Sequence, residues 1–381
     1  MRVGLVCAHS SPPGPSDRPT PGTRQHVARV AAELTIRGHE VRVYDRRDDP
    51  DASEFSTEPP GYRVERVSAG PAAPLPTRKI LPHVPGFSNA LADRWSGDWT
   101  PDVVHGHFWI GGLAGASAVR DSDIPMVQTF HSLGTEQKRH LGREYGGPGE
   151  RIPLERALTR AVDLAVAQSS DEVDELTRMG LQRASVAVVP AGVDTDSFNP
   201  EGDVAPRERR QRILSVSRLE PGHGQQDVIH ALRMVGDAEL VIAGGPPRSS
   251  LARHAEARRL REFADQAGVA DRVTFVGAVP HEQMPAWYRS ADVVASTPHY
   301  ASSGQVPREA MGCGVPVVGY ALGGVADTIV DEVTGRLVQL GDVRTLGIML
   351  RRLLADDAQR FAYGHAAVDR VRCSYTWDRT A

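Results

Sequence analysis

Short apolar runs recur along the chain, and stretches with helical spacing of their hydrophobic positions follow them. The run at residues 3–7 precedes hydrophobic positions at 27, 30, 31 and 34, which share one face of a helix that ends near Gly38. Uniformly apolar strands are typical of parallel sheets that are covered on both faces. The first forty residues therefore predict a buried strand followed by a crossover helix.

The same alternation continues through two halves of the chain. Strands are predicted at residues 41–44, 62–67, 102–105, 125–130, 164–167 and 187–189, and again at 212–217, 239–243, 273–276, 293–295 and 316–318. Strands that alternate with helices indicate βαβ units and doubly wound parallel sheets. A polar, proline-bounded stretch at residues 196–209 separates the halves, and 381 residues favour two domains. We predict Rossmann-like α/β domains at residues 1–195 and 196–364.

Composition narrows the range of partners. The net charge of −4 and the pI of about 6.4 argue against a nucleic-acid or anionic-membrane surface. Cys7, Cys313 and Cys373 have neither metal-ligand spacing nor the spacing of a disulfide framework, so each is expected to be a packed apolar residue. No secretory signal and no run of ~18 apolar residues is visible. We expect a cytoplasmic monomer or homodimer without a membrane span.

The segment at residues 301–318 carries the clearest chemical signal. Its pattern predicts a glycine loop, a short helix and a strand, with Gly304 at the loop and Glu309 in the first turns of the helix. Backbone N–H groups at a helix N-terminus bind anions. The segment therefore indicates a site for a nucleotide sugar.

The order of motifs along nearly the whole chain resembles that of the retaining glycosyltransferases of family 4. These motifs lie at residues 22–23, 105–107, 129–131, 190–194, 217–219, 243–245, 273–277 and 309–317. Residues 107–109 and 130–134 are most similar to sucrose-phosphate synthases and to the N-acetylglucosaminyl transferase of the mycothiol pathway. The resemblance implies the GT-B fold, with two Rossmann-like domains facing across a cleft and a C-terminal helix at 365–381 that packs back on the first domain.

The resemblance implies that Arg218 grips the diphosphate of the donor, where preorganised donors stabilise the developing charge. Five residues later the family has a lysine, whereas this chain has His223. An imidazole has an ordinary pKa near ~6.5, so its charge depends on the pH and on the diphosphate. His223 is then protonated when the donor binds, or donates a neutral hydrogen bond, or makes no phosphate contact.

The remaining donor contacts also follow from the resemblance. Glu309 matches the carboxylate that accepts hydrogen bonds from the ribose hydroxyls. Glu309 is the second carboxylate of the family's Glu-x7-Glu motif, and the first belongs at position 301, where this chain has Ala301. An altered or differently held donor sugar, a slow enzyme and an inactive site are the three explanations. The other residues expected at the nucleotide sugar are Gly277, Gly304, Gln305 and Val306.

In the N-terminal half, His131 ends a predicted strand, and the resemblance implies that it faces the donor sugar. Gly22 and Thr23 precede the first predicted helix, so their N–H groups could meet the diphosphate. Pro21 stands where the family has a further glycine, which removes one donor. The expected catalytic residues are His131, together with Arg218 and His223.

The acceptor side is expected to include Trp109, Thr135, Lys138 and Arg139. An aromatic face packs on a sugar or cyclitol ring. The two basic residues either recognise an acceptor phosphate or are solvated helix charges. His105 and His107 have metal-like spacing, but no third ligand accompanies them, so packing and acceptor contacts are favoured. A metal-independent enzyme without a cofactor is predicted.

We therefore predict a retaining transferase that moves a sugar, with UDP as the favoured nucleotide, to a small hydroxylated acceptor. The changes at Ala301 and His223, and a composition with few lysines, favour an aminocyclitol of an aminoglycoside antibiotic pathway as acceptor. The alternative acceptor is an inositol phosphate. Two further alternatives are a non-catalytic nucleotide-sugar-binding partner of another transferase and a GT-B sugar epimerase.

Overall fold

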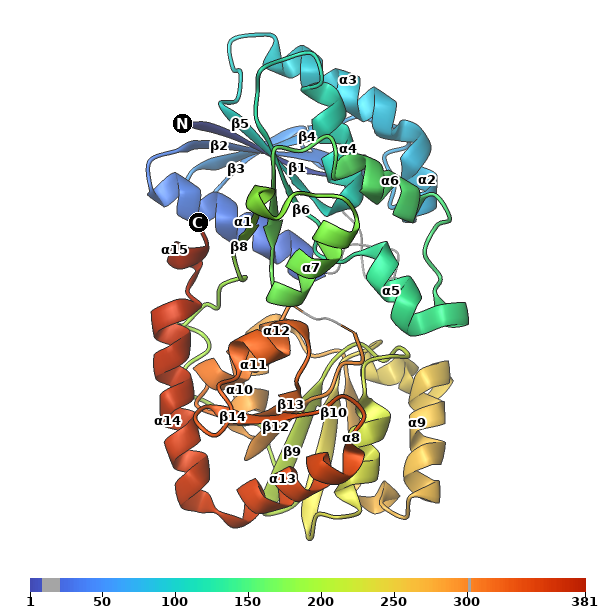
Figure 1. Cartoon of the computed structure of the whole chain (residues 1–381), viewed down its shortest axis with the longest axis vertical. Helices are drawn as coiled ribbons and strands as arrows, with labels where there is room; N and C mark the ends of the chain where they lie inside the picture. The colour runs from blue at the N-terminus through green and yellow to red at the C-terminus, as the bar shows by residue number, and fades with distance from the viewer. Residues whose placement is uncertain (9–20, 301–302) are drawn as a thin grey trace. The chain divides into compact units, whose positions relative to one another are not determined.

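The computed structural model describes all residues except 9–20 and 301–302, and it divides into two α/β units (Figure 1). Unit 1 contains Met1–Pro190 with Thr380 and Ala381, and unit 2 contains Ala191–Arg379. The break therefore follows residue 190, whereas the sequence predicted it after residue 195. Most of the loop predicted at residues 10–22 lies outside the described residues.

Unit 1 is built on an eight-stranded sheet with the order β3-β4-β2-β1-β5-β6-β7-β8. All neighbouring strands are parallel except β3, which is antiparallel to β4. The strands are β1 (Arg2–Cys7), β2 (Glu40–Arg46), β3 (Phe55–Glu58), β4 (Tyr62–Val67), β5 (Val103–His107), β6 (Met126–Thr129), β7 (Leu164–Ala167) and β8 (Val186–Val188). The helices are α1 (Pro21–Ile36), α2 (Thr77–Ile80), α3 (Val84–Trp95), α4 (Phe108–Ala118), α5 (Gly134–Leu141), α6 (Arg151–Leu158) and α7 (Ser170–Arg178).

Both faces of this sheet are buried, as the uniformly apolar strands predicted. Leu5 of β1 packs with Val27 and Ala31 of α1 on one face. The next residue, Val6, packs on the other face in the cluster that includes α3 and α4. Successive side chains of a strand point to opposite faces, so one short apolar run supplies two cores.

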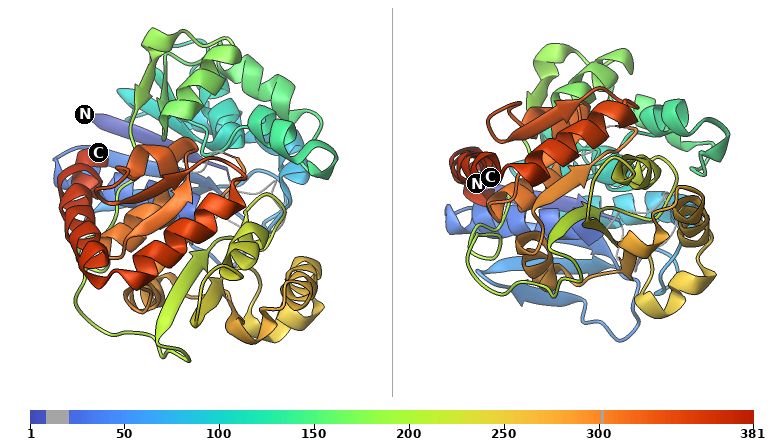
Figure 2. Two further views of the ribbon diagram at one scale, coloured as in Figure 1. Left: turned by 60° about the horizontal axis from the view of Figure 1, so that its bottom comes forward. Right: turned by 90° about the horizontal axis from the view of Figure 1, so that it is seen from below.

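Unit 2 is built on a six-stranded parallel sheet with the order β11-β10-β9-β12-β13-β14. The strands are β9 (Gln211–Val216), β10 (Ala238–Ala243), β11 (Val273–Gly277), β12 (Val293–Ser296), β13 (Val317–Tyr320) and β14 (Gly335–Val338). The helices are α8 (Gln225–Leu232), α9 (Ala255–Gln266), α10 (Met284–Arg289), α11 (Gln305–Gly312), α12 (Gly323–Thr328), α13 (Val343–Ala355), α14 (Asp357–Ser374) and α15 (Trp377–Thr380). Helices cover both faces of each sheet (Figures 1 and 2).

Short 3₁₀ helices complete the described structure. They are η1 (Leu81–His83), η2 (Gly142–Glu144), η3 (Arg183–Ser185), η4 (Arg248–Arg253), η5 (Ala270–Arg272) and η6 (His281–Gln283). All predicted strands are present. The sequence missed β3, an edge strand, and β14.

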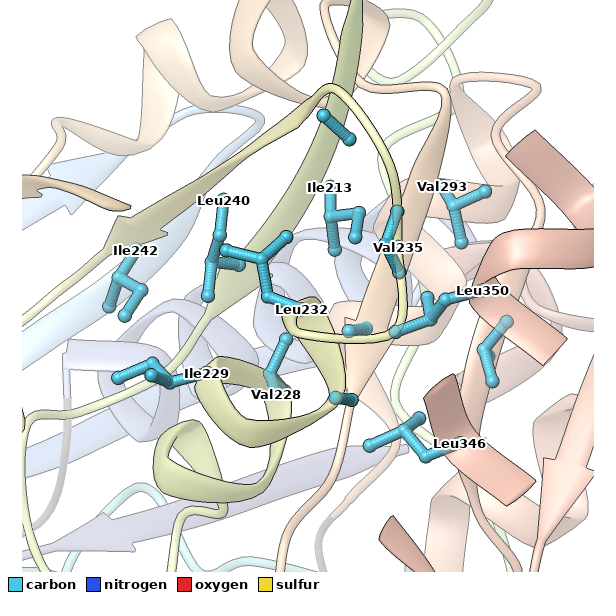
Figure 3. Packing of buried hydrophobic residues seen from close by; sticks show 14 of the residues in the cluster. Ile213, Val228, Ile229, Leu232, Val235, Leu240, Ile242, Val293, Leu346 and Leu350 are labelled. Carbon is cyan, nitrogen blue, oxygen red and sulfur yellow. The ribbon is translucent and has the colours of Figure 1, made fainter. Parts of the chain in front are cut away.

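The larger core of unit 2 lies between its sheet and the helices α8, α9 and α13 (Figure 3). Leu232 of α8 is fully buried there, close to Ile213 of β9 and Leu350 of α13. Leu214, the neighbour of Ile213, lies in the separate core on the opposite face. The two clusters show that unit 2 has the same two-faced construction as unit 1.

The C-terminal helix α14 belongs to unit 2, and the expectation that residues 365–381 pack back on the first domain stays a prediction. A Cβ atom on Gly364 would lie 2.3 Å from the carbonyl oxygen of Gly314, so this helix meets unit 2 backbone to backbone. At the end of the chain, only Thr380 and Ala381 belong to unit 1. There the Thr380 hydroxyl donates to the carbonyl oxygen of Pro190 at 3.0 Å.

Two expectations from composition are also decided by the structure. Among the described residues, no helix combines the length and the apolar character that crossing a membrane requires. All three cysteines are free. Cys313 is buried and Cys7 partly buried, but Cys373 is exposed, so the expectation of packing was wrong for that residue.

Removing the side chain of Leu232 tests the core in Figure 3. Leu232→Ala should lower the free energy of unfolding by about 2–5 kcal/mol, because the truncation leaves a cavity among helices and strands. Urea denaturation followed by circular dichroism measures the effect. Leu340→Ala is the matched control, because Leu340 is 46% exposed and its truncation should cost less than about 0.5 kcal/mol. Equal effects of the two substitutions would contradict the packing described here.

Candidate functional site

A cavity of about 160 Å³ lies at the carboxyl ends of β9 and β12 in unit 2. The strand β9 has β10 on one side and β12 on the other, so the direction of winding reverses between them. Doubly wound sheets bind ligands at such a switch point. Four residues selected from the sequence line this cavity: Arg218, His223, Gln305 and Val306.

Arg218 and His223 share one hydrogen-bond partner, the hydroxyl of Tyr300. Nη2 of Arg218 donates to this oxygen at 3.3 Å, and Nε2 of His223 lies 3.0 Å from it. The Gln225 side chain donates to the carbonyl oxygen of Arg218 at 2.7 Å, and Glu220 pairs with its guanidinium at 3.4 Å. Tyr300 therefore orders both predicted diphosphate contacts.

The imidazole of His223 is neutral at physiological pH. Burial lowers its pKa to about 3, and the charges of Arg218 and His299 act in the same direction. Because Tyr300 accepts a hydrogen bond from Arg218, its hydroxyl is oriented to donate to Nε2 of His223. Of the two charge states left open by the sequence, the structure favours the neutral one, with the proton on Nδ1.

Helix α11 begins beside the cavity, directly after Gly304. This glycine has φ of +73°, and a Cβ atom there would lie 2.4 Å from the carbonyl oxygen of Gly324. Both the backbone conformation and the close approach require glycine. The first N–H groups of a helix have no partner within it, so they are available to a ligand. Ala301, the position of the missing carboxylate, lies outside the described residues.

Glu309 lies one turn further along α11, is 5% exposed, and already has three donors. Its Oε2 accepts from the Tyr288 hydroxyl at 2.9 Å. Its Oε1 lies 3.0 Å from Nε2 of Gln305 and 3.1 Å from Nε2 of His281. Burial, followed by the charge of Glu309, raises the pKa of Tyr288 well above its usual value, so this tyrosine stays a donor. One carboxylate oxygen is therefore held from inside, and the other has outer partners that a ligand can replace.

Arg308 anchors the same helix through hydrogen bonds to neighbouring segments. Its guanidinium donates to the carbonyl oxygen of Ala191 at 2.5 Å, to Thr328 Oγ1 at 3.3 Å and to the carbonyl oxygen of Ser303. Burial lowers the pKa of Arg308 to about 10, which leaves it charged at neutral pH. The loop before α11 is thus held by a buried cation that bonds to backbone oxygens.

Gly277 does not line the cavity, although the sequence placed it at the donor. It ends β11 with φ of +79°, and a Cβ atom there would lie 2.8 Å from both the carbonyl oxygen of Pro246 and the backbone nitrogen of Arg248. The close packing of this position against Pro246 and Arg248 is enough to explain why it is a glycine. Its contact with a nucleotide sugar stays a prediction.

In unit 1, Gly22 and Thr23 belong to the first turn of α1, which begins at Pro21. The sequence had placed them in the loop before the helix. Gly22 is exposed and Thr23 is half-buried. Their N–H groups lie among the unpaired donors of a helix start, so the predicted anion contact is compatible with this position.

His131 follows β6 and has φ of +61°, a strained conformation for a residue with a side chain. A fully buried ion pair fixes the loop beyond it, with Nε of Arg151 2.6 Å from Oε1 of Glu155. Arg151 donates to the carbonyl oxygen of Ser132 at 2.9 Å, and Glu155 accepts from the N–H of Gly134 at 2.8 Å. The ion pair thus holds the backbone that orients His131.

His131 belongs to a cluster of histidines in unit 1. Its Nε2 lies 3.0 Å from Nδ1 of His107, and His26 brings a third ring nitrogen, all three within 4.8 Å of one another. The ring of His105 lies beside that of His107, with the centroids 4.2 Å apart, and it bonds the Thr129 hydroxyl at 2.8 Å. Burial lowers the pKa of His105 to about 4 and those of His107 and His131 well below the usual value. These three rings are therefore neutral.

The sequence had selected His105 and His107 as a pair with metal-like spacing and found no third ligand. The structure instead groups His107 with His131, and it adds His26 from α1. Nothing in the spacing of these three positions signals that they meet. The order β1-β5-β6 brings them together, because α1 follows β1 and the other two histidines lie at the ends of β5 and β6.

Trp109 is the one predicted acceptor contact that the structure contradicts. Its side chain is 0% exposed and lies in the hydrophobic core of unit 1 with Phe87 and Met126. Helix α4 starts at Phe108, directly after β5, and this start turns the next side chain inward. The indole ring therefore stabilises the fold and offers no face to a sugar or cyclitol.

The other three acceptor candidates lie on α5. Lys138 is exposed, and so is Arg139, which pairs with Glu175. The Thr135 hydroxyl is half-buried and lies 3.5 Å from the sulfur of Met179. Of the two basic residues, Lys138 is exposed to a ligand, whereas Arg139 would have to give up its ion pair with Glu175 to bind one.

The sequence did not reveal the residues that hold the predicted site residues in place. Tyr300 hydrogen-bonds to Arg218, and Tyr288 hydrogen-bonds to Glu309; the sequence had selected both of these partners. Tyr300 directly precedes the glycine loop, which is a usable signal. Tyr288 had no such signal, because its role depends on the packing of α10 against α11.

Two family models match the chain in succession. The model described as Glycosyltransferase Family 4 matches residues 21–197, and the one described as Glycosyl transferases group 1 matches residues 199–370. The two matches meet close to the break between the structural units.

Curated relatives match along the whole chain. The D-inositol 3-phosphate glycosyltransferase of Xylanimonas cellulosilytica is 33% identical, with 100% of this chain and 94% of the relative covered. The protein of the same name from Mycolicibacterium smegmatis is 31% identical, with 98% and 91% covered.

Solved structures show the same likeness at the level of the fold. Sucrose-phosphate synthase from Thermosynechococcus elongatus matches with a TM-score of 0.86 and 26% identity, covering 100% of this chain and 96% of that one. Anabaena HepE, solved with UDP and glucose, matches with a TM-score of 0.74 at 18% identity, covering 99% and 96%.

The neutral state of His223 can be tested by NMR. With ¹³C-labelled histidine, the Cε1–H signal assigned to His223 by its loss in His223→Gln should show no titration between pH 5 and 8. The reason is that burial holds its pKa at about 3. The Gln225→Glu variant, which places a carboxyl beside the carbonyl of Arg218, serves as a check that a nearby charge moves the signal. A midpoint near the ordinary histidine value of about 6.5 would contradict the neutral assignment.

Proposed function

The chain belongs to glycosyltransferase family 4 and has the GT-B fold, and from this premise we propose that it glycosylates a phosphorylated cyclitol of the inositol phosphate class. It is a glycosyltransferase that uses a nucleotide sugar. The observation that carries the acceptor proposal is the full-length similarity to D-inositol 3-phosphate glycosyltransferases. This similarity favours an inositol phosphate over an aminocyclitol as the acceptor, because the relatives give the aminocyclitol no support.

The donor half of the proposal rests on the cavity at the switch point of unit 2. Arg218 is the only charged side chain among the described residues that line it, and His223 adds a neutral hydrogen-bond donor. The start of α11 adds backbone N–H groups. A guanidinium with several neutral donors suits a nucleoside diphosphate, and we favour UDP as the nucleoside diphosphate.

The ribose is proposed to bind Glu309. Tyr288 keeps Oε2 in place from the interior, while Oε1 exchanges Gln305 and His281 for the ribose hydroxyls. The side chain of His281 is 43% exposed, so it can leave without disturbing the core. The two hydroxyls of the ribose then take the place of Gln305 and His281 as donors, so the carboxylate keeps the same number of hydrogen bonds.

The proposed reaction retains the anomeric configuration without a protein nucleophile. The bond between the anomeric carbon and the diphosphate oxygen breaks, and the acceptor oxygen bonds the same face of the sugar. The acceptor proton passes to the departing diphosphate oxygen. Arg218 and the neutral donors around it stabilise the charge that forms, and positioning supplies the rest of the catalysis.

The acceptor phosphate is proposed to contact α5 of unit 1. Lys138 is exposed there and carries one of the few lysine charges of the chain. Arg139 is a second cation, held by Glu175 until a phosphate competes for it. The neutral ring of His131 fits its proposed role of bonding a sugar hydroxyl, since it both donates and accepts.

Transfer by the purified chain tests the acceptor directly. We expect kcat/KM for D-inositol 3-phosphate to exceed that for unphosphorylated inositol by about 10-fold or more, because one charge-assisted contact contributes about 1.5–3 kcal/mol. UDP-glucose, UDP-galactose and UDP-N-acetylglucosamine are the donors, and product formation is followed by mass spectrometry. The control acceptor is 2-deoxystreptamine.

The other outcomes distinguish the alternatives. Faster transfer to 2-deoxystreptamine would restore the aminocyclitol acceptor. Donor turnover without any acceptor would indicate an epimerase. Tight UDP binding without transfer to any acceptor would favour a non-catalytic partner of another transferase.

Replacing Glu309 tests the ribose contact. Glu309→Gln should weaken UDP binding by about 10–100-fold in calorimetry, because the charge-assisted hydrogen bonds to the ribose are lost. Glu332→Gln is the matched control, since this glutamate has 69% side-chain exposure and should leave the affinity unchanged. An unchanged UDP affinity in Glu309→Gln, with an unchanged melting temperature, would exclude Glu309 as the ribose contact.

A further inference from the structure

Three histidines from separate segments of unit 1 converge at the carboxyl ends of β5 and β6. His26 and His107 are 6% and 1% exposed, and His131 is partly buried. The ring centroids of His26 and His131 lie 5.0 Å apart, and those of His107 and His131 lie 5.3 Å apart. This edge, between β1 and β5, is the switch point of the sheet in unit 1, where doubly wound sheets bind ligands.

Internal hydrogen bonds do not satisfy the cluster completely. An amide nitrogen can only donate, so Gln168 Nε2 donates to Nδ1 of His131 at 3.4 Å. His131 then carries its proton on Nε2 and donates to Nδ1 of His107 at 3.0 Å. Nε2 of His107 is buried and has no hydrogen-bond partner among the residues that the structure describes. This nitrogen carries the proton of the neutral ring, so Nδ1 is the nitrogen of His107 whose lone pair is available.

We propose that His26, His107 and His131 form a binding site for a divalent transition-metal ion of the Zn²⁺ type, with water as the fourth ligand. Imidazole nitrogens suit Zn²⁺ and its neighbours, whereas Mg²⁺ and Ca²⁺ select oxygen ligands. One ring nitrogen of each residue already lies within 4.8 Å of the other two. A tetrahedral Zn²⁺ with Zn–N bonds of about 2.0–2.1 Å needs nitrogens about 3.3 Å apart.

Forming the site requires one proton to move and none to be gained. His131 shifts its proton from Nε2 to Nδ1, and the freed Nε2 lone pair joins the Nδ1 lone pair of His107. The side-chain amide of Gln168 then turns to present its oxygen to the Nδ1–H. A hydrogen bond from the second nitrogen of a ligating histidine to such an acceptor is the usual arrangement around a protein-bound metal.

One of the three proposed ligands, His26, borders a cavity. A cavity of about 270 Å³ in unit 1 is lined by His26 and His105, with apolar residues of α1 such as Val30 around it. His105 itself bonds Thr129 and stands outside the proposed ligand set. It therefore offers a control inside the same cluster.

Metal titration of the untagged, full-length protein tests the site. Calorimetry should show one equivalent of Zn²⁺ bound, and Co²⁺ should give the visible absorption of a tetrahedral complex. His26→Gln and His131→Gln should each weaken Zn²⁺ binding by about 100-fold or more, since even residues behind the ligands change affinity by 10–100-fold. His105→Gln and the exposed His365→Gln should retain it.

Several outcomes would overturn the proposal. They are the absence of stoichiometric Zn²⁺ binding by the wild type, an octahedral Co²⁺ spectrum, unchanged affinity in His26→Gln, and loss of binding in His105→Gln. Circular dichroism checks that each variant is folded. The wild-type Co²⁺ spectrum and the rise of its melting temperature with Zn²⁺ do not depend on any variant.

A consequence for catalysis rests on the proposed function. Zn²⁺ bound to His131 would remove this side chain from the sugar, so Zn²⁺ should slow transfer at least about 10-fold and EDTA should restore it. Metal binding without any transferase activity would leave the site standing and reject the proposed function. Transfer that is unaffected by stoichiometric Zn²⁺ would instead reject the role of His131 in the reaction.

Discussion

Close approach of backbone to backbone at two glycines sets the geometry of unit 2. Gly224 precedes α8 with φ of +74°, and a Cβ atom there would lie 1.7 Å from the carbonyl oxygen of Thr297. Gly304 precedes α11 in nearly the same conformation, against the backbone of Gly324. Backbone cannot move aside as the tip of a side chain can, so any other residue would push these helices away from the strand ends. The positions of the residues around the cavity depend on this spacing.

Burial determines which side chains at the cavity of unit 2 carry a charge. A lysine at position 223 would bring a second permanent cation to the cavity, but a strongly hydrated ammonium ion is costly to bury. Neutral His223, bonded through Tyr300 to Arg218, avoids this cost. A diphosphate would then meet one guanidinium and several neutral donors. Such a site relies on well-aimed dipoles more than on net charge, which makes it sensitive to small displacements.

The strands could be predicted because buried parallel strands have uniformly apolar sequences. Gln305 and Val306 could be placed at the cavity because they belong to a local motif of glycine loop and helix, whereas their contact with a donor stays a prediction. The edge strand β3 was missed because a strand at the edge of a sheet is less buried and therefore contains few apolar residues. Trp109 was assigned to a surface because its direction depends on where α4 starts, which spacing does not reveal. His26 was missed because the order of strands, not the distance along the chain, places it beside His107.

The two units use the same switch-point position for different chemistry. In unit 1 this edge gathers neutral imidazoles, whose lone pairs can accept hydrogen bonds or coordinate a metal. In unit 2 it presents the guanidinium of Arg218, which can only donate and therefore repels a cation while it attracts a phosphate. Burial enforces the difference, since low-dielectric surroundings keep the histidines uncharged while the arginine retains its charge. The same fold thus presents neutral imidazoles in one unit, which suit a transition-metal cation or a sugar hydroxyl, and a guanidinium in the other, which suits a diphosphate.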